Sequence, residues 1–166
     1  MELVDIVDDN LKTLYSISKS EAHLKGLLHK TVISEVIDSQ GKILLVKQAG
    51  HKQDAGQFVS PVGGHVSAGE SNDDALLRET KEEIGIKNFK FKLLGSFIFN
   101  RQVIGRHENH FFIIYKITSD SNPILNDESS DFKWFSKKEI IQGMSKDKKM
   151  FGDALYPIWE KFNSDF

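Results

Sequence analysis

Short runs of apolar residues, many of them β-branched or aromatic, predict the strands of this chain. The predicted strands are Thr31–Ile37, Lys42–Val46, Phe89–Phe99, His110–Ile117 and Phe132–Phe135. A turn at Asp38–Gly41 joins the first two into a hairpin. The polar segment Lys47–Ser60 is expected to form a loop over one end of the sheet.

Helices are predicted beside these strands. Ser136 and Glu139 match a capping box at the start of one helix, and apolar residues recur at helical spacing between Leu155 and Phe162. Residues 1–28 are a lead-in, of which we expect residues 1–22 to be loosely structured. Because strands dominate and helices flank them, we predict an α/β (α+β) fold, a mixed β-sheet sandwiched between helices, in a single domain over residues 1–166.

The segment Gly63–Ile86 predicts a glycine-rich loop followed by a helix over Asn72–Ile84. Ser71 is a suitable N-cap and Gly85 a suitable C-terminal stop. With successive residues about 100° apart, the helix has two distinct faces. The face expected to pack on the sheet carries Leu77, Thr80 and Ile84, with Leu76 at its edge. The opposite face carries Glu79, Glu82 and Glu83.

Three carboxylates within one helical turn repel one another, which destabilises a helix. A solvated charged face would be the plain explanation. However, only Arg78 and Lys81 lie nearby in the sequence to relieve the repulsion, and the preceding loop ends in another acid, Glu70. Mg²⁺ binds through a few carboxylates together with substrate phosphate oxygens. The pattern therefore predicts a magnesium site.

Composition excludes several other kinds of chemistry. The chain has 166 residues, no cysteine and a formal net charge of -2. The lack of cysteine excludes disulfides, thiolate zinc sites and cysteine nucleophiles. The charge provides no basic surface for nucleic acid or an anionic membrane, so neither is expected as a partner. The acidic N-terminus does not resemble a signal peptide and no apolar stretch approaches a membrane span, so we expect a cytoplasmic location.

The loop and helix resemble the Nudix box, which reads Gly, five residues, Glu, seven residues, Arg-Glu, an apolar residue, any residue, Glu-Glu, any residue, Gly and an apolar residue. Its strict positions are filled by Gly64, Glu70, Arg78, Glu79, Glu82, Glu83 and Gly85. Thr80 stands where an aliphatic residue is usual. The resemblance implies a Nudix fold and a hydrolase dependent on Mg²⁺, or on Mn²⁺. Such an enzyme cleaves a pyrophosphate bond in a small molecule, either a nucleoside diphosphate linked to another group or a related diphosphate.

The resemblance also implies a role for each box residue. The metal ligands would be the carbonyl of Gly63 and the carboxylates of Glu79, Glu82 and Glu83. The residues expected to take part in catalysis are Glu82, Glu83, Arg78 and Glu70, with Arg78 and Glu70 paired so that they hold the loop against the helix.

Further site residues are expected outside the box. A fourth ligand or base in this family usually comes from a later strand or loop, and Glu108, just before a strong strand, is our candidate. Lys47, Lys52 and Arg101 are candidate phosphate contacts by position. Dimers are common among similar proteins, so the resemblance is also compatible with a homodimer.

Residues elsewhere resemble the Nudix proteins most similar to isopentenyl-diphosphate isomerase, notably around Glu21–His29 and Gly63–His65. That isomerase holds a metal with histidines and glutamates and uses a cysteine. Here Gly63 stands in the place of the cysteine and His110 in the place of its second glutamate. Proton transfer at carbon needs acid and base groups on both faces of the substrate, so the hydrolase is favoured and the isomerase is the alternative.

Three questions stay open at the level of sequence. A non-catalytic nucleotide-binding module is a further alternative, although such a module would be free to lose glutamates that are all present here. The histidines that we weigh as either metal ligands or packed structural residues are His23, His29 and His65. Nucleoside triphosphates, nucleotide sugars, dinucleoside polyphosphates and isoprenoid-like diphosphates are all compatible with the box.

Overall fold

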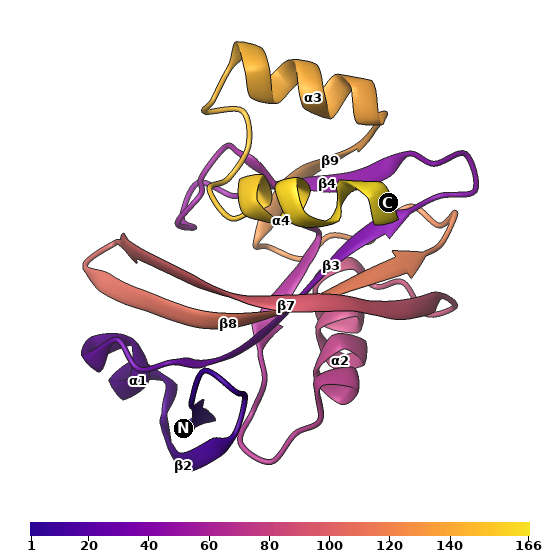
Figure 1. The fold of residues 1–166 in the computed structure, drawn as a ribbon. Helices are drawn as coiled ribbons and strands as arrows, with labels where there is room; N and C mark the ends of the chain where they lie inside the picture. Colours follow the sequence, from indigo (N-terminus) through magenta and orange to yellow (C-terminus); the bar gives the residue numbers. More distant parts are fainter.

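The computed structural model describes all residues, 1–166, and shows a mixed β-sheet with helices against both faces (Figure 1). The strands are β1 (Leu3–Val7), β2 (Thr13–Ser18), β3 (His29–Ile37), β4 (Ile43–Gln48), β5 (Phe58–Val59), β6 (Val62–His65), β7 (Lys90–Val103), β8 (Arg106–Thr118) and β9 (Ser129–Phe135). The helices are α1 (Lys19–Lys25), α2 (Asn72–Ile84), α3 (Lys137–Lys146) and α4 (Leu155–Phe162), followed by a 3-10 turn at Asn163–Asp165. None of the helices has the length and hydropathy needed to cross a bilayer.

Strand β3 is the centre of the sheet. It pairs with β8 in parallel along its whole length and with β1, β4 and β6 antiparallel. All of its residues except Lys30 are buried. A strand covered on both faces needs a nearly continuous apolar sequence rather than an alternating one, which explains the composition of β3 and of its neighbours β4 and β8.

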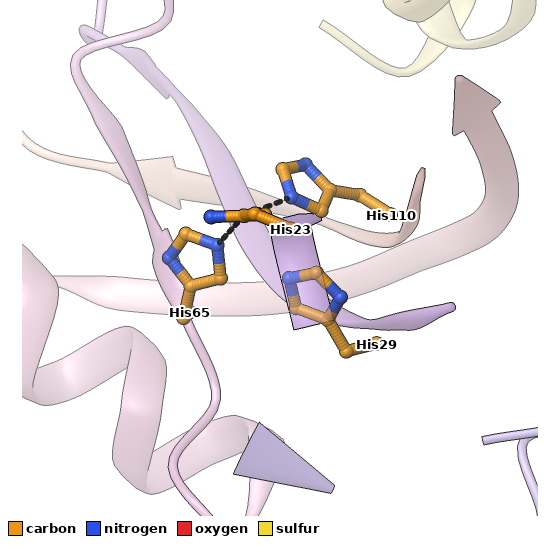
Figure 2. A group of neighbouring side chains, drawn as sticks. All are labelled: His23, His29, His65 and His110. Carbon is orange, nitrogen blue, oxygen red and sulfur yellow. Dashed lines mark hydrogen bonds between the residues drawn. The ribbon is translucent and has the colours of Figure 1, made fainter. Parts of the chain in front are cut away.

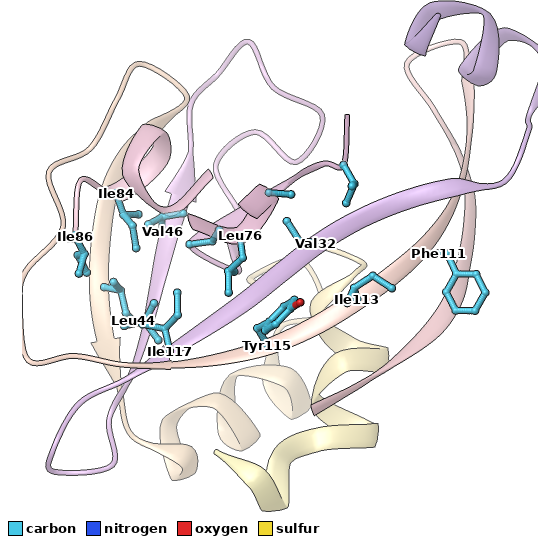
Figure 3. Close-up of a cluster of buried hydrophobic side chains, with 14 of the residues drawn as sticks. Val32, Leu44, Val46, Leu76, Ile84, Ile86, Phe111, Ile113, Tyr115 and Ile117 are labelled. Atoms are coloured by element: carbon cyan, nitrogen blue, oxygen red, sulfur yellow. The ribbon is translucent and has the colours of Figure 1, made fainter. Parts of the chain in front are cut away.

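Alternate residues of these central strands contribute to two apolar layers, one on each face of the sheet. The layer under α2 includes Val32, Leu44, Leu76, Ile84 and Ile113 (Figure 3). The layers under α3 and α4 include Ile33, Ile37, Phe112, Ile140 and Ile158. The predicted arrangement, a mixed sheet sandwiched between helices, is therefore confirmed.

Helix α2 has the predicted bounds. The side chain of Ser71 accepts a hydrogen bond from the Asp74 amide at 3.1 Å, as an N-cap should. Gly85 ends the helix with a φ of 63°, in the left-handed region that glycine adopts without strain. These capping signals are local, so the sequence alone was sufficient to place both ends.

The rotation of α2 about its axis differs from the prediction at one residue. Leu76 and Thr80 are fully buried, but Leu77, expected on the sheet face, is 44% exposed. Because neighbouring residues are about 100° apart, a helix that buries Ala75 and Leu76 turns Leu77 toward solvent. Thr80 fits in the core because its hydroxyl donates to the Leu76 carbonyl at 2.7 Å.

The N-terminal residues are regularly structured, which corrects the expectation of a loosely structured lead-in over residues 1–22. Strand β1 pairs with β2 and, at Ile6, with His29 of β3, so this hairpin extends the main sheet. Val4, Ile6 and Ala22 form a small buried cluster beneath it. Most of β2 is exposed, and a strand without a buried face leaves no alternating pattern to detect.

Strands β7 and β8 form a hairpin, and each is longer than the strand predicted there. The turn is at Ile104 and Gly105, which both have positive φ, of 48° and 70°. This turn places Glu108 inside β8, opposite Arg101 of β7, rather than in a loop ahead of the strand. The expected loop at Lys47–Ser60 also contains the short strand β5.

We predict that Leu76→Ala lowers the free energy of unfolding by about 2–5 kcal/mol, the usual cost of truncating a buried leucine. The neighbouring Leu77→Ala is the matched control and should change it by no more than about 0.5 kcal/mol, because that side chain is largely solvated. Urea unfolding of both variants measures the difference. Equal destabilisation would contradict this orientation of α2.

Candidate active site

Strand β6 and helix α2 face each other across the loop that joins them, and two glycines make the approach possible. The amide of Gly63 donates a hydrogen bond to Oε2 of Glu83 at 2.7 Å. A Cβ atom on Gly64 would lie 2.0 Å from Cδ of Glu79, so any other residue here would displace that carboxylate from its position. The two carboxylates are thus held against the backbone of β6.

Arg78 connects the loop, the strand and the helix. Its Nε and Nη2 atoms donate to the two carboxylate oxygens of Glu70, each at 2.9 Å, in a bidentate pair. Nη2 also donates to the carbonyl of His65 at 3.0 Å, and Nη1 forms an ion pair with Glu79. The hydrogen bond from Arg78 lowers the pKa of Glu70 and keeps it ionised. The expected pairing of Arg78 with Glu70 is therefore present.

The three box glutamates differ in exposure. Burial raises the pKa of Glu83 to about 8, and the neighbouring Glu79 adds to this effect. Burial also raises the pKa of Glu79, against the opposing influence of Arg78. The Glu82 side chain is 57% exposed and lies 3.8 Å from Nη1 of Arg78. Glu83 has no ion-pair partner, so its charge is the least compensated of the three.

Two adjoining cavities meet at Gly63, Gly64 and Glu83. The first contains the charged groups of the box; its lining includes Lys52, Arg78, Glu79, Glu82, Glu83 and Glu128. The second continues from the glycines toward α4 and is lined in part by Ile33, Asp54, Val59, Arg101, Arg106, Glu108, Phe112 and Leu155. A charged compartment thus opens beside one with a partly apolar wall.

The donor atoms of the charged cavity fit a hard divalent cation. Five glutamates line it, among them Glu79, Glu82 and Glu83 of the box, and Mg²⁺ prefers oxygen ligands. The half-buried carboxylate of Glu83 has no ion-pair partner, so it is costly when ionised unless a cation compensates it. The glycine backbone of β6 leaves Glu79 within the same space. The residues present therefore match a magnesium ion.

The candidates outside the box occupy different surroundings. Glu108 is buried and lines the second cavity, but its oxygens accept hydrogen bonds from Arg101 at 2.8 Å and from Arg106 at 2.7 Å. These arginines lower its pKa despite the opposing effect of burial. Arg101 also donates to Asp54 at 3.0 Å, so this candidate phosphate contact is engaged with two carboxylates. Glu108 as a metal ligand stays a prediction.

The two lysines that are candidate phosphate contacts differ in their position relative to the cavities. Lys52 lines the charged cavity and pairs with Glu128 at 2.9 Å. Lys47 lines neither cavity, and its Nζ lies 5.9 Å from the centre of the Phe58 ring. The position of Lys52 is compatible with a phosphate contact, whereas that of Lys47 offers no support for one.

Several residues of the site were not predicted. Asp54 enters it through a contact with Arg101, which is distant in sequence, and Arg106 pairs with Glu108 two residues further along β8. Glu35 is completely buried and accepts a hydrogen bond from Ser60, a residue of the cavity wall. Burial raises its pKa to about 7. No local pattern marks these residues, although the acid within the apolar strand β3 was a signal for Glu35.

Comparisons with known proteins agree with this geometry. The NUDIX domain model matches residues 27–155, so the chain belongs to the Nudix family. "Isopentenyl-diphosphate Delta-isomerase 2" of Photorhabdus laumondii is 31% identical over 96% of this chain and 89% of its own length. "Uncharacterized Nudix hydrolase SCO1686" of Streptomyces coelicolor is 36% identical over 56% of this chain and 55% of its own. The crystal structure of DR0079 from Deinococcus radiodurans has the same fold, with a TM-score of 0.79 over 97% of this chain and 99% of that one, at 20% identity.

The raised pKa of Glu83 predicts a pH-dependent stability in the metal-free protein. The folded state holds this proton up to about pH 8, whereas the unfolded chain releases it near 4.5. The free energy of unfolding should therefore fall as pH rises through this window. The glutamine of Glu83→Gln cannot titrate, so the free energy of unfolding of this variant should rise relative to that of the wild type between pH 5 and pH 8. Urea unfolding in chelator at several pH values measures the difference in stability, and a difference that stays constant with pH would refute the raised pKa of Glu83.

Proposed function

We propose that the protein is a Mg²⁺-dependent hydrolase that cleaves a pyrophosphate bond in a nucleoside diphosphate linked to another group, or in a related diphosphate. The observation that carries this proposal is the complete set of box carboxylates, Glu79, Glu82 and Glu83, on the wall of one cavity beside Gly63 and Gly64. A diphosphate is itself anionic, so this acidic surface requires a cation between protein and substrate.

The chain's own residues would hold the site in place. When bound, Mg²⁺ would neutralise the carboxylates and activate the water that attacks phosphorus. Arg78 fixes the loop through Glu70 and the His65 carbonyl, while the Gly63 amide orients Glu83. A bound cation would lower the raised pKa of Glu83 and release its proton, and Glu83 is then our candidate to receive the proton of the attacking water. One P–O bond of the diphosphate then breaks, and two phosphate-bearing products leave.

Basic side chains at the junction of the cavities would bind the substrate phosphates. Arg106 lines both cavities, and Lys52 lines the charged one. Ile33, Val59 and Phe112 on the wall of the second cavity would contact the group attached to the diphosphate. We propose Mn²⁺ as an alternative metal, because it also accepts carboxylate ligands.

Isomerisation of isopentenyl diphosphate is the second candidate, favoured by the name of the relative from Photorhabdus laumondii. The residues here argue against it. Gly63 replaces the cysteine implied by that resemblance, and its amide is bound to Glu83. Both oxygens of Glu108 are held by guanidinium groups, and His110 replaces the second glutamate. The hydrolase therefore has the more complete set of reacting groups.

Glu83→Gln should reduce the rate of Mg²⁺-dependent pyrophosphate cleavage by at least about 10², because the variant keeps the shape of the side chain but loses the charge and the base. Glu160→Gln, an exposed glutamate of α4, is the matched control and should keep the wild-type rate. A screen of diphosphate compounds with product analysis supplies the substrate for both assays.

Two results would contradict the proposed function. A fully active Glu83→Gln protein would remove Glu83 from the reaction. Conversion of isopentenyl to dimethylallyl diphosphate by the wild type, abolished by Glu108→Gln, would establish the isomerase instead.

A further inference from the structure

The second cavity, which runs from Gly63 toward α4, has polar groups within its partly apolar wall. Thr31 and Ile33 of β3 line it, and so does Ser60, which lies between β5 and β6. Thr31 is only 6% exposed, and its Oγ1 atom is buried without a hydrogen-bond partner. A buried hydroxyl without a partner is costly. An apolar ligand in this cavity would leave that cost in place.

Glu35 lies directly behind this wall. It follows Thr31 and Ile33 on the same face of β3, because alternate residues of a strand share a face. It is completely buried, and its Oε1 atom accepts a hydrogen bond from the hydroxyl of Ser60, whereas Oε2 has no partner. Its neighbours on that face, Ile33 and Ile37, belong to the apolar layers under α3 and α4. An acid among such side chains costs stability, so packing does not explain its presence.

The hydrogen bond between Ser60 and Glu35 fixes how the Ser60 hydroxyl can act toward a ligand. A hydroxyl has one proton and two lone pairs. Ser60 donates its proton inward, to Oε1 of Glu35, so only lone pairs are left for the cavity that it lines. Burial raises the pKa of Glu35 to about 7, and above that pH the carboxylate has no proton with which to reverse the bond. The cavity then presents a hydrogen-bond acceptor at Ser60.

Four charged side chains of the same cavity are engaged with one another. Arg101 donates to Asp54 at 3.0 Å and to Glu108 at 2.8 Å, and Arg106 donates to Glu108 at 2.7 Å. Their hydrogen bonds are made within the protein. The hydroxyls of Thr31 and Ser60 are different, because each keeps capacity for a partner that enters the cavity.

We propose that Ser60, oriented by Glu35, accepts a hydrogen bond from a hydroxyl or amino group on the moiety attached to the diphosphate, an inference that rests on the proposed function. Thr31 would give the same moiety a second polar contact. Glu35 acts through Ser60 and is therefore a positioning residue. A hydrocarbon chain would leave both hydroxyls without partners, so the cavity favours a sugar or an amino-bearing base over an alkyl or alkenyl group. A site that hydrogen-bonds its substrate rejects an analogue without the donor, because its own polar groups stay unpaired.

Pairs of diphosphates that differ at one hydrogen-bonding group test this inference. Cytidine and uridine diphosphate carry an amino and a carbonyl group at the same ring position. The other pairs are adenosine and 2′-deoxyadenosine diphosphate, and dimethylallyl diphosphate with and without a terminal hydroxyl. Their α,β-methylene analogues cannot be cleaved, so calorimetry with Mg²⁺ at pH 8.5, where Glu35 is ionised, gives each Kd. In at least one pair, the wild type should bind the compound with the donor at least about tenfold more tightly.

Three variants assign that preference to residues. Ser60→Ala should bind the preferred compound only as tightly as its partner, whose Kd stays at the wild-type value, whereas a general structural defect would weaken both. Glu35→Gln should reduce the preference to about threefold or less, because the glutamine amide can donate to Ser60 and release its proton toward the ligand. Ser34→Ala is the matched control and should keep the preference, since Ser34 is a buried serine of β3 that donates to the Tyr115 carbonyl and does not line the cavity.

Absence of a preference in every pair would overturn the inference, as would a preference that survives Ser60→Ala or Glu35→Gln. If Glu35→Gln fails to fold by circular dichroism, Ser60→Ala decides. Cleavage of the parent compounds is measured separately. Cleavage without a preference would leave the hydrolase standing and remove the inference. A preference without cleavage would refute the proposed function and retain the recognition of a donor at Ser60.

Discussion

The constraint on which this structure depends is the negative charge gathered on one turn of α2. Like charges three and four residues apart cost a helix a few tenths of a kcal/mol per pair, and partial burial of Glu79 and Glu83 adds to that cost. The surroundings compensate only in part. Arg78 neutralises Glu70 and approaches Glu79, and the Gly63 amide donates to Glu83. The remaining charge explains why the site requires a cation.

The fold makes this arrangement possible through β3. One central strand pairs with β6, which lies against the glutamates, and with β8, which forms one wall of the second cavity. The apolar layer under α2 fixes the helix through Leu76 and Ile84, so Glu79 and Glu83 lie against β6 and not in the core. The same two strand pairings bring His29, His65 and His110 close to one another, and His23 of α1 joins them (Figure 2). His23 and His65 line the same cavity as the box carboxylates.

Local signals predicted much of the fold and of the box. Capping residues placed the ends of α2, and apolar runs placed β3, β4 and β8 within a few residues. Tertiary packing decided the rest. Leu77 points to solvent because the helix is rotated toward Leu76, and β2 was missed because it has no buried face. The partners of Glu108 and the gathering of His110 with the other histidines depend on strand register, which no local pattern records.

The central claim, that the glutamates of α2 hold a cation, is tested most directly by thermal unfolding of the wild type and Glu82→Gln, each in chelator and in excess Mg²⁺. Magnesium should stabilise the wild type by about 2.7 kcal/mol at a hundredfold excess over Kd. Glu82→Gln should equal or exceed the wild type in chelator, because repulsion falls, and should gain less from Mg²⁺. A variant clearly less stable in chelator, with the same gain from Mg²⁺, would show that Glu82 is a structural partner and not a ligand.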